Sequence, residues 1–286
     1  MKTTDLHFEF ELFKKNHLVC KFEKDGTAGE YISCGSGGKT ILLFHGFAGN
    51  AESVYKFILA FESEYRIICP TIPALQHASL AIALDYIQCI LELENLRPDI
   101  LIGGSFGGLL AQAYWYANRE TVKKVILFDT SPPDKVSGNK NRKAASIMKY
   151  LPWIVFKPLL GVKLGKLFRI NRDMEPSTKE LIQFSKERFE KRFQAISRRL
   201  LLTHSDIAFD FMIHTVAPQL TEQDARLLIL HSTDDPAARE ADILFKRTYP
   251  FAQIISFTGA GHIGSLIYFD NYIEAMKNLM KTANTL

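Results

Sequence analysis

Ser105 lies in a glycine-rich segment, residues 103–108, and has a glycine two positions before it and another two positions after it. A strand-like apolar stretch, residues 99–102, precedes this segment, and a helix-like stretch, residues 109–114, follows it. This pattern is typical of a sharp strand-to-helix turn, a nucleophile elbow, that holds a serine hydroxyl out at the end of a sheet. The glycines let strand and helix approach without a Cβ clash. The pattern predicts a nucleophilic serine, and the two flanking elements weigh against a merely flexible glycine-rich loop.

A serine hydroxyl attacks a carbonyl only when a nearby base accepts its proton. The best candidate base is His262, which follows the last predicted strand in residues 258–262. The carboxyl ends of parallel strands meet at one edge of a sheet, so a loop there brings the imidazole to the same edge as Ser105.

An acid must in turn orient the histidine and balance its charge. Asp234 and Asp235 follow the predicted strand 226–230, and either carboxylate could hold the tautomer of His262. Asp129, at the end of the predicted strand 125–128, is a third candidate, with a cap of the turn beside Ser131 as its alternative role. The residues alone leave this choice open.

Strands and helices must alternate to place these side chains at one edge. We expect strands at 40–44, 66–69 (stopped by Pro70), 100–102, 125–128, 226–230 and 253–257, and helices at 53–61, 80–96, 239–247 and 271–281. At the N-terminus, the alternation in residues 6–13 predicts a hairpin of strands 7–13 and 17–22, followed by a strand at 31–33. The whole pattern predicts an α/β fold with a mostly parallel sheet and helices on both faces.

The pattern changes after residues 131–133. Residues 135–143 are polar and turn-rich, and residues 144–170 suggest short helices punctuated by proline and glycine. Residues 177–180 match a capping box that should begin a long helix. Its predicted apolar face contains Ile182, Phe189, Phe193, Ile196 and Leu200. We therefore expect a core formed by residues 1–130 and 216–286, with residues 131–215 inserted as a helical cap.

Three motifs together resemble the α/β-hydrolase superfamily: residues 45–47, residues 103–107 and residues 261–262, with serine, acid and histidine in the superfamily's chain order. The resemblance covers nearly the whole chain but singles out no one member. It implies a catalytic triad of Ser105, Asp235 and His262, because the superfamily's Gly-x-x-Asp register favours Asp235, although Ser232 stands at the glycine position. It also implies an oxyanion hole made by the backbone N–H groups of Phe47 and Phe106.

The resemblance further implies hydrolysis of a carboxylic ester or thioester through an acyl-enzyme on Ser105, with no cofactor and no metal. The alternatives are acyl transfer or C–C bond hydrolysis by the same triad, or a ligand-binding protein without turnover. His45, Trp153 and Phe156 are candidates for the substrate pocket, and His45 has a second possible role, which is to support the turn by hydrogen bonds. Because the chain lacks a dinucleotide-binding glycine motif and a P-loop, nucleotide chemistry has no support.

Charge is uneven along the chain. Its formal net charge is +4, but residues 131–220 contain 17 Lys and Arg against 8 Asp and Glu. A basic cap could attract an acidic substrate or an acidic acyl carrier protein. Membrane contact is the weaker reading, because Glu180, Glu187 and Glu190 are mixed among the basic residues. We expect no nucleic-acid partner, no stable membrane insertion and a cytoplasmic location, since no signal-like or membrane-spanning stretch is present and four cysteines show no paired spacing.

Overall fold

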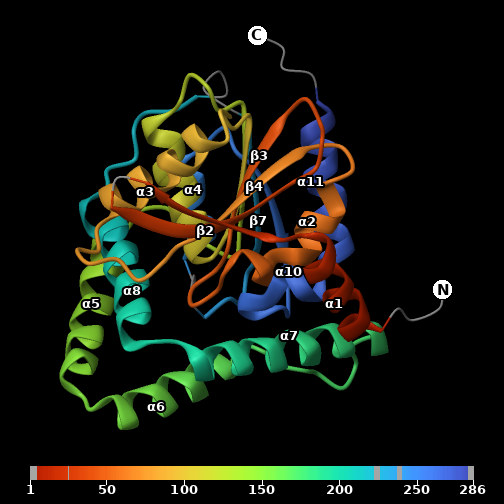
Figure 1. Cartoon of the computed structure of the whole chain (residues 1–286). Coiled ribbons are helices and arrows are strands. Elements are labelled where there is room, and N and C mark those ends of the chain that lie inside the picture. Colours follow the sequence, from red (N-terminus) through yellow and green to blue (C-terminus); the bar gives the residue numbers. More distant parts are fainter. Residues whose placement is uncertain (1–4, 25, 222–225, 237–239, 283–286) are drawn as a thin grey trace.

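The computed structural model describes residues 5–24, 26–221, 226–236 and 240–282, and its centre is an eight-stranded sheet (Figure 1). The strand order is β1-β2-β4-β3-β5-β6-β7-β8. β2 pairs antiparallel with both β1 and β4, and all the other neighbours are parallel. The strands are β1 (Val19–Lys24), β2 (Thr27–Cys34), β3 (Thr40–Phe44), β4 (Arg66–Thr71), β5 (Ile100–Gly104), β6 (Lys124–Phe128), β7 (Arg226–Ser232) and β8 (Gln253–Phe257).

Helices cover both faces of this sheet and bury a separate apolar core on each. One core joins the sheet to α3 (Leu80–Leu93), α4 (Phe106–Ala117) and α9 (Ala241–Thr248). The other joins it to α1 (Leu6–Asn16), α2 (Tyr55–Phe61) and α11 (Phe269–Lys281). The shorter elements are η1 (Ala51–Val54), η2 (Gly261–Ile263) and α10 (Gly264–Ile267). The predicted fold class is confirmed, and within the described residues no helix is long and apolar enough to cross a membrane.

Most predicted strands lie where the sequence placed them, and β3 and β8 have the predicted bounds. Pro70 was expected to stop β4, yet the strand continues to Thr71. The reason is that β3 pairs with β4 only as far as Ile68, so Pro70 lies beyond the parallel ladder and faces Tyr31 of β2. Proline is tolerated where one side of a strand is free of ladder bonds.

The predicted first strand at 7–13 is wrong, because these residues belong to helix α1. Asp5 caps this helix, since its side chain accepts hydrogen bonds from the backbone N–H groups of His7 and Phe8. Phe10 and Phe13 lie on the buried side and both contact the ring of Tyr55 in α2. The aromatic residues therefore fit one face of a helix as well as one face of a strand. The N-cap at Asp5 favours the helix.

Four helices, and no strand among the described residues, lie between β6 and β7: α5 (Lys135–Tyr150), α6 (Trp153–Gly165), α7 (Pro176–Ala195) and α8 (Arg198–His214). Residues 135–143 are helical rather than turn-rich, since Asp134 accepts hydrogen bonds from the backbone of Val136 and Ser137. Gly138 lets α5 lie close to α8, because a Cβ there would approach Ile213 and Met212 to within 3 Å.

The long helix predicted from residue 177 exists, with two corrections. It begins at Pro176 with Glu175 as N-cap, so residues 177–180 form its first turn rather than a capping box. It also ends at Ala195, and Ser197 caps the next helix, so Leu200 belongs to α8.

The junction of β5 and α4 brings two backbones unusually close together. A Cβ built on Gly103 would lie 2.2 Å from the carbonyl oxygen of Gly107, and a Cβ on Gly107 would lie 2.6 Å from that of Phe44. Only glycine fits at these positions, because the neighbouring atoms are backbone and cannot move aside.

We expect Gly103→Ala to lower the free energy of unfolding by about 2 kcal/mol or more, because the added methyl group overlaps backbone atoms. Gly38→Ala is the matched control, since a Cβ there meets no atom within 4 Å; its expected change is within about 0.5 kcal/mol. Urea unfolding of both variants measures the difference. Equal stabilities would contradict the close approach of β5 and α4.

Candidate active site

Ser105 forms the turn between β5 and α4 with a strained backbone, at φ 51° and ψ −121°. Its N–H donates to the carbonyl of Phe128 at 3.0 Å, and its own carbonyl accepts from the Thr130 hydroxyl at 2.8 Å. Both partners come from β6 and the residues just after it, so the neighbouring strand holds the turn in place. A serine with positive φ costs about 1–3 kcal/mol and persists only when its surroundings fix it.

His262 and Asp235 complete a chain of hydrogen bonds that starts at Ser105. The hydroxyl oxygen of Ser105 lies 2.9 Å from Nε2 of His262, and Nδ1 of His262 lies 2.8 Å from a carboxylate oxygen of Asp235. Since a carboxylate only accepts, Nδ1–H donates to Asp235 and Nε2 can accept the serine proton. Asp235 is 1% exposed, so water hardly competes for this bond.

The structure separates the two adjacent acids that the sequence left open. Asp235 contacts His262, whereas the Asp234 carboxylate accepts from the backbone N–H groups of Gly259 at 2.9 Å and Gly261 at 3.3 Å. The Ser232 hydroxyl also donates to Asp234, and these bonds together hold its pKa below its usual value. Asp234 therefore fixes the loop that carries His262, and Asp235 contacts the imidazole itself.

A second buried carboxylate influences His262. Burial lowers the pKa of His262, but the hydrogen bond and charge of Asp235, together with the charge of Asp129, outweigh it and place the pKa above its ordinary value. Asp129 accepts from the Tyr272 hydroxyl at 3.0 Å and from the Ser265 N–H at 3.1 Å. Burial raises the pKa of Asp129 to about 6. Asp129 thus acts on the site through its charge and by binding α10 and α11, which follow His262.

The two predicted oxyanion-hole donors belong to Phe106, which follows Ser105 in sequence, and to Phe47, whose ring contacts that of Phe106. The N–H of Phe106 is the first of α4 and has no partner within the helix. Phe47 lies in the loop after β3, and its ring meets that of Phe106 edge to face at 6.4 Å. Among the hydrogen bonds of the described residues, none uses the backbone N–H of Phe47 or of Phe106.

Side chains from α7 and α8 hold the loop that contains Phe47. Arg192 donates to the carbonyls of Ala48 at 2.8 Å and Gly49 at 2.6 Å. Nδ1 of His204 accepts from the N–H of Ala48 at 3.1 Å, and its Nε2–H donates to the carbonyl of Ile72. Ala48 has a φ of 60°, so these bonds fix a strained backbone directly after Phe47.

The three residues expected to line a substrate pocket are placed as follows. His45 is 1% exposed; its Nδ1–H donates to the carbonyl of Gly46 and its Nε2 accepts from the N–H of Ile72. Its contacts are those of a residue that supports the loop. Phe156 is buried in one apolar cluster with Ala48, and Trp153 is half-buried against that cluster. Their contact with a substrate stays a prediction.

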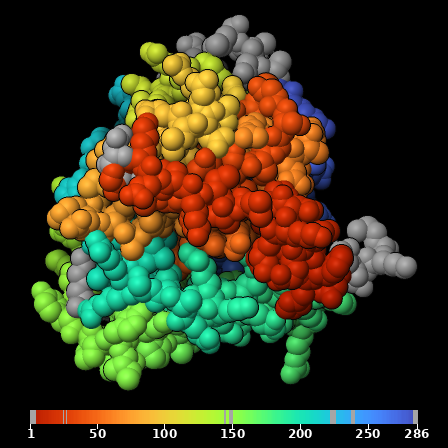
Figure 2. Space-filling view, viewed as in Figure 1, coloured from red at the N-terminus to blue at the C-terminus, as the bar shows by residue number. Residues whose placement is uncertain are grey.

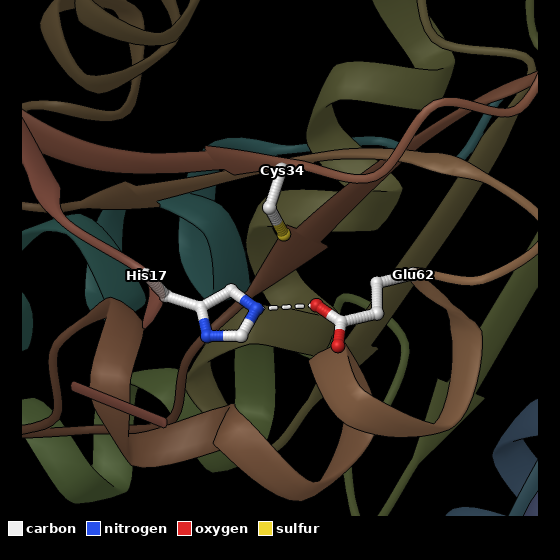
Figure 3. Close-up of side chains that lie close together, drawn as sticks. All are labelled: His17, Cys34 and Glu62. Atoms are coloured by element: carbon white, nitrogen blue, oxygen red, sulfur yellow. Dashed lines mark hydrogen bonds and ion pairs between the residues drawn. The ribbon is translucent and has the colours of Figure 1, made fainter. Parts of the chain in front are cut away.

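A separate group of side chains has the types that bind a metal ion (Figure 3). His17, Cys34 and Glu62 place one ligand atom each within 4.8 Å of one another, and each side chain is half-buried. Nε2 of His17 already pairs with Glu62, while its Nδ1–H donates to the carbonyl of Phe13. Burial, followed by the charge of Glu62, raises the pKa of Cys34 to about 12, which keeps the thiol protonated. The bonds of His17 tie the end of α1 to the end of α2.

Arg192, His204, Asp129 and Asp234 are the site residues whose contacts the sequence did not predict. No spacing in the sequence distinguishes His204 or Arg192 from the other histidines and arginines of the chain. Their contacts depend on how α7 and α8 pack onto the loop after β3, which is a tertiary property.

Comparison with known proteins identifies similar chains. The family model described as alpha/beta hydrolase fold matches residues 39–153. "Lipase 1" of Psychrobacter immobilis is 22% identical over 265 residues, covering 84% of this chain and 76% of that protein. A hydrolase structure from Pseudomonas aeruginosa PA01 is similar with a TM-score of 0.75 at 13% identity, over 93% of this chain and 99% of that one. The esterase RhEst1 from Rhodococcus sp. ECU1013 gives a TM-score of 0.70 at 18% identity, over 92% and 98%.

We expect Asp235→Asn to slow the reaction of Ser105 with a serine-directed fluorophosphonate by about 10³–10⁴-fold, because the amide cannot hold the reactive tautomer of His262. Asp234→Asn is the matched control at the adjacent position. It should slow the reaction less than about tenfold and lower the melting temperature, since it weakens loop bonds only. Equal rates for the two variants would remove Asp235 from the chain of hydrogen bonds.

We expect Asp129→Asn to lower the pKa of His262, because a nearby negative charge stabilises the imidazolium and the amide does not. An NMR titration of the His262 ring protons measures this shift. Asp173→Asn, at an exposed position between α6 and α7, is the control and should leave the titration unchanged. An unchanged or raised pKa in Asp129→Asn would show that Asp129 has no electrostatic influence on the site.

Proposed function

We propose that this chain, which has the α/β-hydrolase fold, is a serine hydrolase that cleaves carboxylic esters through an acyl-enzyme on Ser105. The observation that carries this proposal is the chain of hydrogen bonds from Ser105 to His262 at 2.9 Å and from His262 to Asp235 at 2.8 Å. The names of two similar proteins, a lipase and an esterase, favour esters as the substrate class.

The proposed reaction uses each of the three side chains in one role. The Ser105 oxygen attacks the ester carbonyl while Nε2 of His262 takes its proton, and the resulting imidazolium returns that proton to the leaving alkoxide. Water then attacks the acyl-enzyme with His262 again as base, releasing the acid and regenerating Ser105. Asp235 holds Nδ1–H throughout and balances the charge of the imidazolium. A thioester would follow the same steps with a thiolate as leaving group.

The negative oxygen of the tetrahedral intermediate needs hydrogen-bond donors, and we assign this role to the backbone N–H groups of Phe106 and Phe47. One such donor is typically worth about 3 kcal/mol of transition-state stabilisation. Arg192 and His204 fix the loop at Ala48, which is the residue after Phe47. They are therefore positioning residues for the second donor.

Residues 131–215 are proposed to act as a cap over this site. The apolar cluster of Phe156, Phe193, Ile196 and Leu201 includes Ala48 and packs against Phe47, so α6 and α7 contact the loop next to the nucleophile. An apolar wall at this place suits the acyl part of an ester, because it excludes water from the reacting carbonyl.

We expect Ser105→Ala to reduce kcat for a p-nitrophenyl ester by about 10⁵–10⁶-fold, since the nucleophile acts as a unit with its base. The wild-type protein should form a covalent acyl adduct with the ester, measured by intact mass after rapid quench, and Ser105→Ala should form none.

Ser146→Ala is the matched control, because Ser146 is exposed on α5 and its hydroxyl donates only to the carbonyl of Arg142. It should hydrolyse the ester at the wild-type rate. Wild-type protein that binds the ester without turnover and resists a fluorophosphonate would instead be a binding protein on this fold.

A further inference from the structure

The segment from α5 to the residues after α6 is strongly basic. Residues 135–172 contain no Asp or Glu, although the whole chain is nearly balanced at +4. The three acidic residues that argued against membrane contact, Glu180, Glu187 and Glu190, all lie on α7. They lie outside residues 135–172, on a helix that packs against α6 through a shared apolar cluster. The basic segment carries ten cationic residues: Lys135, Lys140, Arg142, Lys143, Lys149, Lys157, Lys163, Lys166, Arg169 and Arg172.

The same segment exposes large apolar side chains. Among the described residues, it holds seven of the fourteen exposed large apolar side chains. Large contiguous apolar patches on a protein surface mark interaction sites, so a segment that is rich in exposed apolar side chains is a candidate for one. The seven, with their exposed fractions, are Val136 (79%), Tyr150 (89%), Ile154 (82%), Val155 (44%), Leu159 (60%), Val162 (62%) and Ile170 (42%).

Helix α6 has two apolar faces with different surroundings. Its inner face carries Trp153, Phe156, Leu160 and Leu164, which pack into the cluster that contains Ala48. On the opposite side, at about 100° per residue, the exposed apolar residues from Ile154 to Val162 fall within one half of the helix. Lys163 and Lys166 are exposed on that same half. A helix that is apolar on all sides needs a second apolar environment for its outer face.

The position of this face leaves it open to a large partner. Figure 1 shows α5 and α6 meeting at an outer corner of the molecule, away from the sheet, and α6 continuing along the lower edge. In the space-filling view, the light-green atoms of these helices form the lower left margin (Figure 2). A flat surface can therefore approach α6 without meeting the core.

We propose that the outer face of α6, together with the basic residues around it, docks on the surface of an anionic phospholipid bilayer. Apolar side chains on a helix with lysines beside them are the pattern of a helix that lies in the membrane interface. Each basic residue near such a surface contributes about 1 kcal/mol through attraction to anionic headgroups. Charge alone would also suit an acidic protein, but the run of branched aliphatic side chains favours acyl chains.

The inference rests on the proposed function, because docking matters for catalysis only if the chain hydrolyses esters. Docking at α6 would bring lipid esters close to the cap, which contacts the loop after β3. The inner face of α6 packs on Ala48 while its outer face lies on the bilayer. The substrate class is accordingly an ester with long acyl chains held in a membrane, rather than a small soluble ester.

The test is binding of the full chain to vesicles by flotation, with Ser105→Ala used so that no lipid is consumed. Vesicles of phosphatidylcholine alone are compared with vesicles in which about one third is anionic phosphatidylglycerol. We expect at least about tenfold stronger binding to the anionic vesicles, falling steeply as salt is added. Leu159→Ser with Val162→Ser, and separately Lys163→Glu with Lys166→Glu, should each weaken this binding by about tenfold or more.

Matched controls make the same chemical changes elsewhere on the surface. Val216→Ser with Ile243→Ser removes two exposed apolar side chains outside the segment, and Lys15→Glu with Lys21→Glu makes the same charge change. Both control variants should bind the anionic vesicles as strongly as the protein without these substitutions. Equal weak binding to both vesicle types, or equal losses in the α6 variants and the controls, would overturn the proposal. So would salt-sensitive binding to an acidic carrier protein with none to vesicles.

Hydrolysis of a short soluble p-nitrophenyl ester separates this inference from the proposed function. The α6 variants, made with Ser105 intact, should hydrolyse it at the wild-type rate, because Leu159, Val162, Lys163 and Lys166 are exposed away from the buried inner face. Vesicle binding without ester hydrolysis would leave the docking surface in place and refute the esterase. Ester hydrolysis without vesicle binding would do the reverse.

Discussion

The reversal of the chain at Ser105 is the constraint on which the site depends. Its positive φ turns the serine side chain away from the sheet, so that the hydroxyl meets His262 at 2.9 Å. Such a conformation is unfavourable for serine and must be offset by its surroundings. The offset comes from the bonds to Phe128 and Thr130 on the neighbouring strand, and from the space left by Gly103 and Gly107. The turn at Ser105 therefore forms only when β5 and β6 pair in the observed register.

The helices between β6 and β7 fix part of the backbone beside Ser105. His204 accepts the N–H of Ala48 only when its Nδ1 is unprotonated, and burial lowers the pKa of His204 to about 4. Its ring stacks on that of Phe106 at 4.6 Å, so one side chain contacts both segments assigned to the oxyanion hole. Arg192, one of the basic residues of 131–220, donates to loop carbonyls. Part of the basic composition is therefore internal structure.

Local pattern predicted the sheet and the positions of Ser105 and His262 because each of them depends on short-range features. A buried parallel strand is a run of apolar residues, and the residue after it lies at the functional edge whatever the remaining packing is. The prediction for residues 7–13 failed because their apolar pattern fits both the two-residue repeat of a strand and the 3.6-residue repeat of a helix. The feature that favours the helix, the cap at Asp5, is a single residue. The choice between Asp234 and Asp235, and the roles of His204 and Arg192, depend on loop geometry and helix packing, which one sequence does not specify.

If the proposed docking on a bilayer holds, helix α6 connects the loop after β3 with the lipid surface. Its inner residue Phe156 shares a cluster with Ala48, and its outer residues Leu159 and Val162 are mostly exposed. Burying one such aliphatic side chain typically contributes about 1.5–3 kcal/mol of free energy. Burial of several of them would therefore favour binding of this face to a bilayer. Docking of the outer face on a bilayer affects the loop after β3 only if α6 contacts that loop differently in the docked and the free protein. The packing of Phe156 on Ala48 supplies that contact, because moving the helix must change the support of the residue after Phe47.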